Sequence, residues 1–237
     1  MSELVATGAL VLLAGILVAM LEGVRRRNVP ATVNALASLG AAVSPDVVEL
    51  LFRSTDGASV AFSPELTLWL ATAGFLHTLG MLGPYDTVWW WDHLTHTISA
   101  ALVAALVYAS VVVVATHPSG IDLPATAIGG VTVVLTMALG ICWELIELVA
   151  RDVGERIDLN PVLVHYGWKD TALDLVFDLF GALVVLLFDL RLFVPAARPF
   201  PRATRTILTA TVVLVLVGSA AMGLYLVLVA RVRPAVS

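Results

Sequence analysis

The sequence is short of cysteine and of charged residues. Its single cysteine, Cys142, excludes an intramolecular disulfide and a cysteine-rich metal site. Charged residues make up 13% of the 237 residues, which is about half the share found in a soluble domain. No stripe of basic residues is present, so we expect no nucleic-acid partner. A serine nucleophile motif is absent too, which makes metal chemistry the natural route for any hydrolytic activity.

Hydrophobic residues make up 59% of the chain and are gathered in long runs. About 20 apolar residues suffice for a helix to cross the ~30 Å hydrocarbon core of a membrane, and several runs reach that length. The short alternating segments of a membrane β-barrel are absent. We therefore predict an all-α, polytopic bundle of six or seven transmembrane helices in the plasma membrane. It is surrounded by membrane lipids and forms one integral membrane domain over residues 1–237.

Seven runs are candidates for these helices. They cover residues 5–24, 31–52, 66–82, 92–116, 125–150, 170–190 and 207–230. The first is expected to be a retained span and not a cleaved signal peptide, because no basic segment precedes it and three arginines follow it. The second contains Pro45 and several polar residues, so it is either a kinked span or a helix lying in the interface; its 22 residues favour a span. If the N-terminus is outside, eight Lys and Arg residues lie on the cytoplasmic side and five lie outside, whether there are six or seven spans. The positive-inside rule therefore does not separate the two topologies.

The densest polar motif follows three tryptophans at the start of the fourth run. Residues 89–99 are WWWDHLTHTIS, and such tryptophans anchor helices at the membrane interface. On a helix, His93 and His96 (i, i+3) share a face, as do Asp92 and His96 (i, i+4). Polar groups just inside a bilayer are costly and commonly mark functional sites. The alternative is structural, with Asp92 as a helix N-cap and the histidines bonded to neighbouring helices.

Polar residues at helical spacing recur in three more runs. They are His77 near the end of the third run, Glu144 and Glu147 in the fifth, and Asp170, Asp174 and Asp178 in the sixth. Runs three and four are joined at one face of the membrane. Runs four and five are joined at the opposite face, so the connection between runs five and six returns to the first face. All four polar groups therefore end in one leaflet. Asp170 precedes its run and is best explained as an N-cap, while Trp143 and Trp168 are typical interfacial residues.

Imidazole and carboxylate groups without thiolate suit a zinc, iron or manganese ion. Metal sites in helix bundles use inward-facing ligands at i, i+3 spacing, usually Glu-x-x-His, whereas the pairs here are His-x-x-His and Glu-x-x-Glu. We predict a divalent metal in a pocket that opens toward tryptophans 89–91. Its ligands are expected among Asp92, His93, His96, Glu144, Glu147, Asp174, Asp178 and His77, with Glu144 and Asp174 as candidate catalytic carboxylates. The alternative to a metal is that the crowded carboxylates share protons.

Four short motifs contain most of these residues. They are LHTLG at 76–80 with Tyr85, DHLTH at 92–96, WELIE at 143–147, and DT at 170–171 with Asp174, Asp178 and Gly181. In order and spacing they resemble the YjdF-type family of uncharacterised inner-membrane proteins, over a motif-bearing core of residues 66–190. The resemblance implies a multi-span membrane protein with these polar residues as its signature. It implies no established activity, substrate or cofactor.

Three functions are compatible with this pattern. The first is a membrane-embedded, metal-dependent enzyme acting on a lipid-like or other amphipathic small molecule, with a carboxylate as base. The second is a proton- or cation-coupled transporter, and the third is a structural membrane subunit whose polar cluster holds helices together. Transport is the less favoured because residues 103–114 and 129–139 contain no Asp, Glu, His, Lys or Arg.

Overall fold

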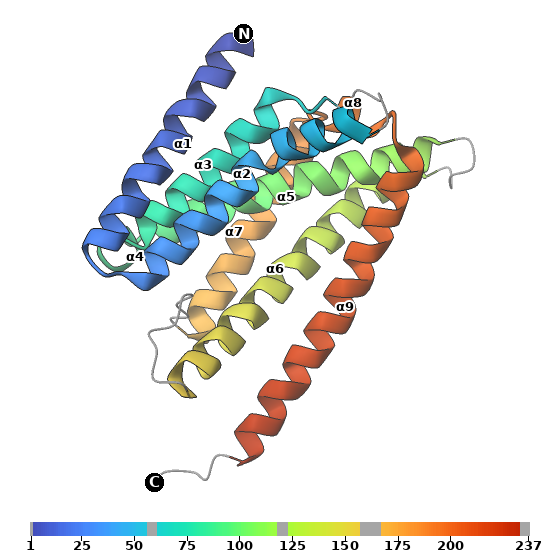
Figure 1. Cartoon of the computed structure of the whole chain (residues 1–237). Helices are drawn as coiled ribbons and strands as arrows, with labels where there is room; N and C mark the ends of the chain where they lie inside the picture. Colours follow the sequence, from blue (N-terminus) through green and yellow to red (C-terminus); the bar gives the residue numbers. More distant parts are fainter. Residues whose placement is uncertain (1, 56–60, 118–122, 157–166, 233–237) are drawn as a thin grey trace.

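The computed structural model of the chain describes residues 2–55, 61–117, 123–156 and 167–232, and these residues form helices and short connections without a strand (Figure 1). The long helices are α1 (Ser2–Arg25), α2 (Val29–Thr55), α3 (Pro64–Gly80), α5 (Trp91–Thr116), α6 (Ala125–Arg156), α7 (Trp168–Leu187) and α9 (Pro201–Val232). Two single turns, α4 (Pro84–Thr87) and α8 (Val194–Ala197), lie between them. The predicted all-α bundle is therefore confirmed.

Five of the long helices are long and apolar enough to cross a membrane. They include Val29–Leu51 within α2, so the run at residues 31–52 has the length and composition of a span. The predicted number of six or seven goes slightly beyond these five. The difference lies in α3, which has only 17 residues, and in α7, whose first three turns contain three aspartates.

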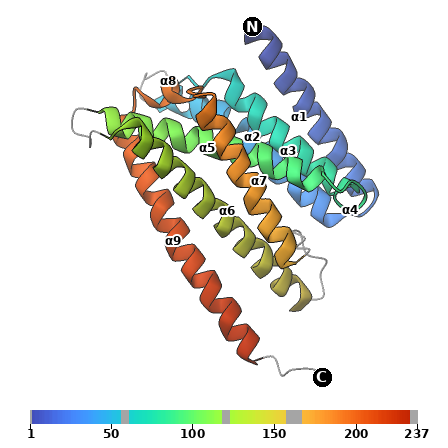
Figure 2. The same ribbon diagram turned by 180° about the vertical axis from the view of Figure 1, so that it is seen from behind.

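The long helices pack in two groups (Figures 1 and 2). Helices α1, α2 and α3 pack on one another, and α5 packs on α7, α6 and α9. The main connection between the groups is the packing of α3 on α5. Around α5 lies a buried apolar core in which small residues alternate with larger ones, such as Ala105, Tyr108 and Val112, and α7 adds Ala182 and Val185.

Helix α7 approaches α5 most closely at Gly181. A Cβ at this position would lie 2.5 Å from the carbonyl oxygen of Thr97 and 2.9 Å from the amide nitrogen of Ala101. Both of these atoms belong to the backbone of α5, which has no room to move aside. The absent side chain of Gly181 therefore sets the separation of the two helices on which most of the polar cluster stands.

A polar contact joins α5 to the residues just after α7, at the end far from the tryptophans. The Tyr108 hydroxyl donates to Asp189, and Arg191 Nε donates to the same carboxylate at 2.8 Å. The hydrogen bond from Arg191 holds the pKa of Asp189 below its ordinary value. Because α5 and α7 are tied here as well as at Gly181, their relative rotation is fixed along the length of α7.

Asp170, which was predicted to be a helix N-cap, is not one, and neither is Asp92, for which a cap was the structural alternative. Helix α5 begins at Trp91 with Trp90 as its N-cap, and α7 begins at Trp168 with Gly167 as its N-cap. Gly167 has φ 116°, a conformation that glycine adopts without strain, and it starts the helix earlier than Asp170 would. The aspartates at 92 and 170 instead lie in first turns, where their charge suits the helix dipole.

Candidate metal centre

The first two turns of α5 present a carboxylate and an imidazole to the same side. Asp92 and His96 are four residues apart, and His96 Nε2 lies 3.8 Å from Asp92 Oδ1. The His96 side chain is buried, with 8% of its surface exposed. An imidazole at this depth needs polar partners, and α7 supplies them.

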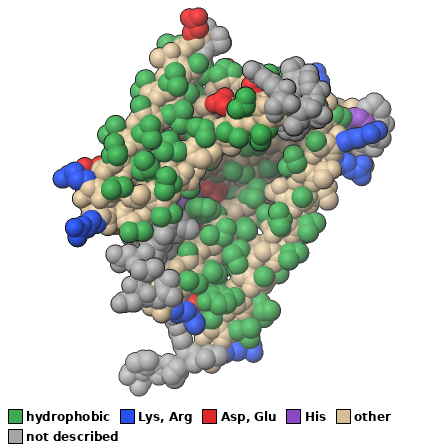
Figure 3. All heavy atoms as spheres, in the orientation of Figure 1, with side chains coloured by type: hydrophobic (Ala, Val, Ile, Leu, Met, Phe, Trp, Pro, Cys, Tyr) green, Lys and Arg blue, Asp and Glu red, His purple; other side chains and the backbone are tan. Residues whose placement is uncertain are grey.

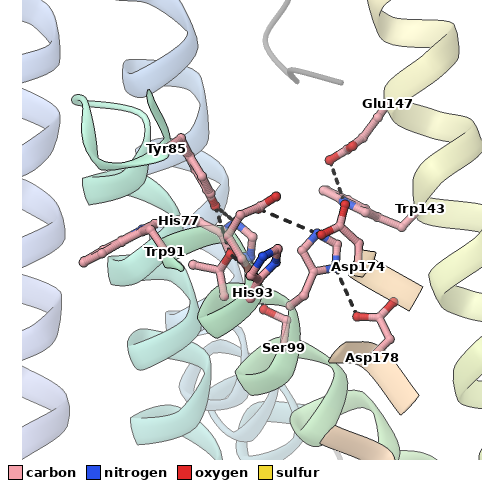
Figure 4. A network of polar contacts seen from close by, with 12 residues as sticks. His77, Tyr85, Trp91, His93, Ser99, Trp143, Glu147, Asp174 and Asp178 are labelled. Atoms are coloured by element: carbon pink, nitrogen blue, oxygen red, sulfur yellow. Dashed lines mark hydrogen bonds and ion pairs between the residues drawn. The ribbon is translucent and has the colours of Figure 1, made fainter. Parts of the chain in front are cut away.

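Helix α7 places two aspartates, Asp174 and Asp178, one turn apart against His96; both aspartates are labelled in Figure 4. Asp178 Oδ1 lies 3.1 Å from His96 Nδ1, and Asp174 Oδ1 lies 3.8 Å from Nε2. Both aspartates are buried, at 6% and 2% exposure. Gly140 of α6 makes room for this arrangement, because a Cβ there would collide with Asp178 Oδ2.

The two nitrogens of His96 therefore have different roles. When the Asp178 carboxylate is ionised and the imidazole is neutral, the hydrogen-bonded Nδ1 carries the proton and Nε2 presents a lone pair. The contacts from Nε2 to Asp92 and Asp174, at 3.8 Å, are too long for hydrogen bonds. Within the described part of the chain, Asp174 Oδ1 has no hydrogen-bond partner although it is buried.

These features fit a metal site. Asp92, His96 and Asp174 each offer one ligand atom, and the three atoms lie within 4.8 Å of one another. Ligands about 2.0–2.2 Å from a zinc ion stand roughly 3.4 Å apart, so only a small inward movement is needed. A carboxylate bonded to the second nitrogen of a ligating histidine, as Asp178 is here, is the usual outer partner of such a ligand.

Two cavities meet at His96. The first, of about 270 Å³, lies between α2 and α3 on one side and α5 and α6 on the other; the second, of about 340 Å³, lies between α5 and α6. His77, His96 and Trp143 line both. Figure 3 shows the hollow between the α1–α3 side and α6, with acidic side chains inside it.

The pocket was predicted to open toward tryptophans 89–91, and none of these three residues lines either cavity. Trp89 is 82% exposed, whereas Trp91 is half-buried and its indole donates to the Leu76 carbonyl at 3.1 Å. Trp91 thus joins α5 to α3, whereas the lining of the first cavity includes the exposed Ala37 and Ala41 of α2.

The other two predicted histidines lie next to the group of three and not within it. His77 bonds to the Tyr85 hydroxyl through Nδ1 (2.6 Å) and to Ser99 Oγ through Nε2 (3.1 Å). With both nitrogens engaged, His77 forms a wall of the cavities. His93 is stacked on Phe177, with ring centroids 4.4 Å apart, so the expected pair of imidazole ligands is not formed.

The two glutamates of α6 also lie outside the group of three. Glu147 lines the first cavity and accepts a hydrogen bond from Trp143 Nε1 at 2.9 Å. Glu144, one turn earlier, is buried with 3% exposure. Trp143 was assigned to the membrane interface on its residue type alone. Its i, i+4 spacing to Glu147 would have predicted that Trp143 lies on the same helix face as Glu147 and lines the same cavity.

Replacing Asp178 by asparagine should weaken metal binding by about 10- to 100-fold, the usual loss for an outer partner of a ligating histidine. The amide can still accept from Nδ1, but it no longer supplies the charge that strengthens the imidazole as a ligand. Competition with a chelator of known affinity, followed by elemental analysis, measures the change. Equal metal affinity of the variant and the wild type would contradict the role assigned to Asp178.

Comparison with known proteins agrees with the sequence-based resemblance. A family model described as "Predicted membrane protein (DUF2238)", which is the YjdF-type family, matches residues 7–194. No curated protein and no solved structure matches the chain. The match and the five apolar helices together make this a multi-pass membrane protein.

Proposed function

The chain belongs to the DUF2238 family of predicted membrane proteins, and we propose that it is a membrane-embedded metalloenzyme acting on an amphipathic substrate. The proposed ligands are Asp92, His96 and Asp174. One observation carries the proposal: the imidazole of His96 is held by Asp178 through Nδ1, and its Nε2 faces two carboxylate oxygens. This arrangement orients a nitrogen lone pair toward anionic oxygens, and a cation between them would satisfy all three.

The ligand types favour a zinc, iron or manganese ion. Such an ion, when bound, supplies Lewis acidity toward a substrate oxygen or water. Three protein ligands leave room for substrate, as catalytic sites require. Glu147 lines the cavity beside these ligands and is suited to accept a proton. In this assignment Asp174 holds the metal, and Glu147 acts as the base, although the sequence analysis named Glu144 and Asp174 as the candidate catalytic carboxylates.

The apolar part of α5 favours an enzyme over a transporter. Beyond the site, residues 103–114 of α5 are mostly buried and contain no Asp, Glu, His, Lys or Arg. Residues 129–139 of α6 likewise contain no Asp, Glu, His, Lys or Arg, although among them only Thr132 and Thr136 are buried. An ion crossing this half of the bundle would lose its hydration without compensation, whereas an enzyme needs access from one side only.

Removing the metal should lower the thermal stability of the detergent-solubilised protein. A metal at 100 times its Kd stabilises the folded state by about 2.7 kcal/mol. In a chain of this size each kcal/mol shifts the melting midpoint by about 2–4 °C, so a strong chelator should lower it by about 5–10 °C. Adding back zinc, manganese or iron(II) should restore it for the metal that the site selects.

Elemental analysis of the purified protein accompanies the melting experiment. About one metal ion per chain is expected before chelation. If the midpoint stays constant under every condition and no metal is found, the cluster is a structural one whose carboxylates share protons. Ion flux in proteoliposomes would favour the transporter instead.

A further inference from the structure

We propose that the substrate is an amphiphile whose head carries no negative charge, and that it reaches the metal centre sideways from the membrane between α2 and α6. This inference rests on the proposed metal site. It adds the route of access and the charge of the head group, both of which follow from the walls of the two cavities.

Small side chains form the outer wall of the first cavity. Helix α2 contributes Ala37, Ser38 and Ala41, and α3 contributes Ala73 and Gly74. Ala37 and Ala41 are exposed at the surface of the bundle, so this wall reaches the region that lipid occupies. The hollow follows from the packing, because α2 packs on α1 and α3 and α6 packs on α5, α7 and α9.

The inner ends of the cavities differ in character. The first cavity ends on the polar side chains of Tyr85, Asp92, His96 and Glu147. The second continues past His96 along an apolar wall that includes Val103 and Leu139. Their volumes, about 270 and 340 Å³, lie near the lower end for small-molecule sites of roughly 300–1,000 Å³. A polar centre flanked by two apolar spaces fits a molecule with one polar group and a hydrocarbon chain.

The charges around the cavities exclude an anionic head group. Asp92 and Glu147 line the first cavity and Asp178 lines the second, while among the described residues neither lining contains a lysine or arginine. Arg26, which reaches the end of α3, is held by Glu22 and the Leu82 carbonyl. A phosphate or carboxylate head would find no lysine or arginine among the described residues of these linings to pair with, only carboxyl groups. A phosphate or carboxylate head would therefore be repelled, whereas a hydroxyl or amine would be tolerated.

The test uses three photoreactive probes with the same 16-carbon chain and different heads: an alcohol, an amine and a phosphate monoester. Each is crosslinked to the metal-loaded full chain in neutral phospholipid vesicles, and mass spectrometry locates the labelled residues. The alcohol or the amine should label the walls of the two cavities, and the phosphate should label them at least about tenfold less, a difference equivalent to 1.4 kcal/mol. Equal labelling by the phosphate would overturn the inference.

Ala41→Trp tests the route, because it fills the outer wall without touching a metal ligand. Labelling of the second cavity should fall at least about tenfold. Leu36→Trp is the matched control, since Leu36 is an exposed residue of α2 outside the cavity lining, and its labelling should equal that of the wild type. Unchanged labelling in Ala41→Trp would refute access between α2 and α6. Ala37→Trp provides the same test should Ala41→Trp not fold.

Metal content, measured in every sample, separates this inference from the proposed function. If metal is bound but the labelling does not change with the charge of the head group, or does not change in Ala41→Trp, only the substrate inference is contradicted. A wild-type chain without metal contradicts the proposed function.

Discussion

Asp174→Asn is expected to abolish metal binding, with metal content falling from about one ion per chain to below a tenth of that. Asp174 supplies one of the three ligand atoms and its carboxylate is buried. Loss of an outer partner alone costs 10- to 100-fold in metal affinity, so loss of a charged ligand should cost on the order of 100-fold or more. The melting midpoint of the variant should no longer respond to chelator or added metal.

The same substitution separates a metal centre from a structural lock. Without metal, Asp174 Oδ1 is a buried acceptor without a hydrogen-bond partner in the described part of the chain, and other carboxylates surround it. Removing that charge should leave the chelated protein at least as stable as the chelated wild type. Asp46→Asn, at an exposed position of α2, is the control and should keep full metal content. An Asp174→Asn protein that retains its metal would refute the assignment, and one that unfolds with or without chelator would favour the structural lock.

Gly181→Ala is expected to destabilise the protein by about 3 kcal/mol, at the upper end of the cost of overpacking a core. The added methyl group would lie 2.5 Å from the Thr97 carbonyl oxygen, so α7 must move away from α5. That movement would also draw Asp174 and Asp178 away from His96, and metal binding should weaken with stability. Chemical unfolding in detergent, followed by circular dichroism, measures the first effect and elemental analysis the second.

Gly130→Ala is the matched control for this substitution. Gly130 lies within α6, and an added Cβ would meet no atom within 4 Å. The change should be neutral or should stabilise the helix by up to about 1 kcal/mol, because alanine is the better helix former. If the two substitutions cost the same, the close approach of α7 to α5 is not what limits stability.

The helices were largely predictable from the sequence, because apolar length is a direct physical requirement of the membrane. The fourth run, predicted at residues 92–116, corresponds to α5 at Trp91–Thr116. Helix starts were less predictable. Aspartate is a stronger N-cap residue than glycine on average, yet Gly167 starts α7 through its backbone conformation, which side-chain preference does not reveal.

The sequence predicted which residues form the candidate site better than it predicted how they are arranged. Helical spacing placed Asp92 with His96 and Asp174 with Asp178, and connectivity brought both pairs to one face. Spacing does not tell which of His93 and His96 meets the aspartates of α7, because their side chains are only about 60° apart around a helix of 3.6 residues per turn. The rotation of α5 against α7 decides it, through Gly181 and the stacking of His93 on Phe177. The proposed access between α2 and α6 depends on how α2 and α3 pack beside α6. No local sequence pattern predicts that packing.

The two sides of the metal centre are far apart along the chain, and this has a consequence for biosynthesis. His96 and Asp178 are separated by 82 positions, and all of α6 lies between the helices that bear them. A ribosome that has delivered α1 to α6 to the membrane has completed the outer wall of the cavity but only the α5 half of the centre. The proposed centre is completed only when α7 joins α5, so we expect metal loading to be a late event in the maturation of the protein. A chain cut short before Asp174 would insert its first helices and remain metal-free.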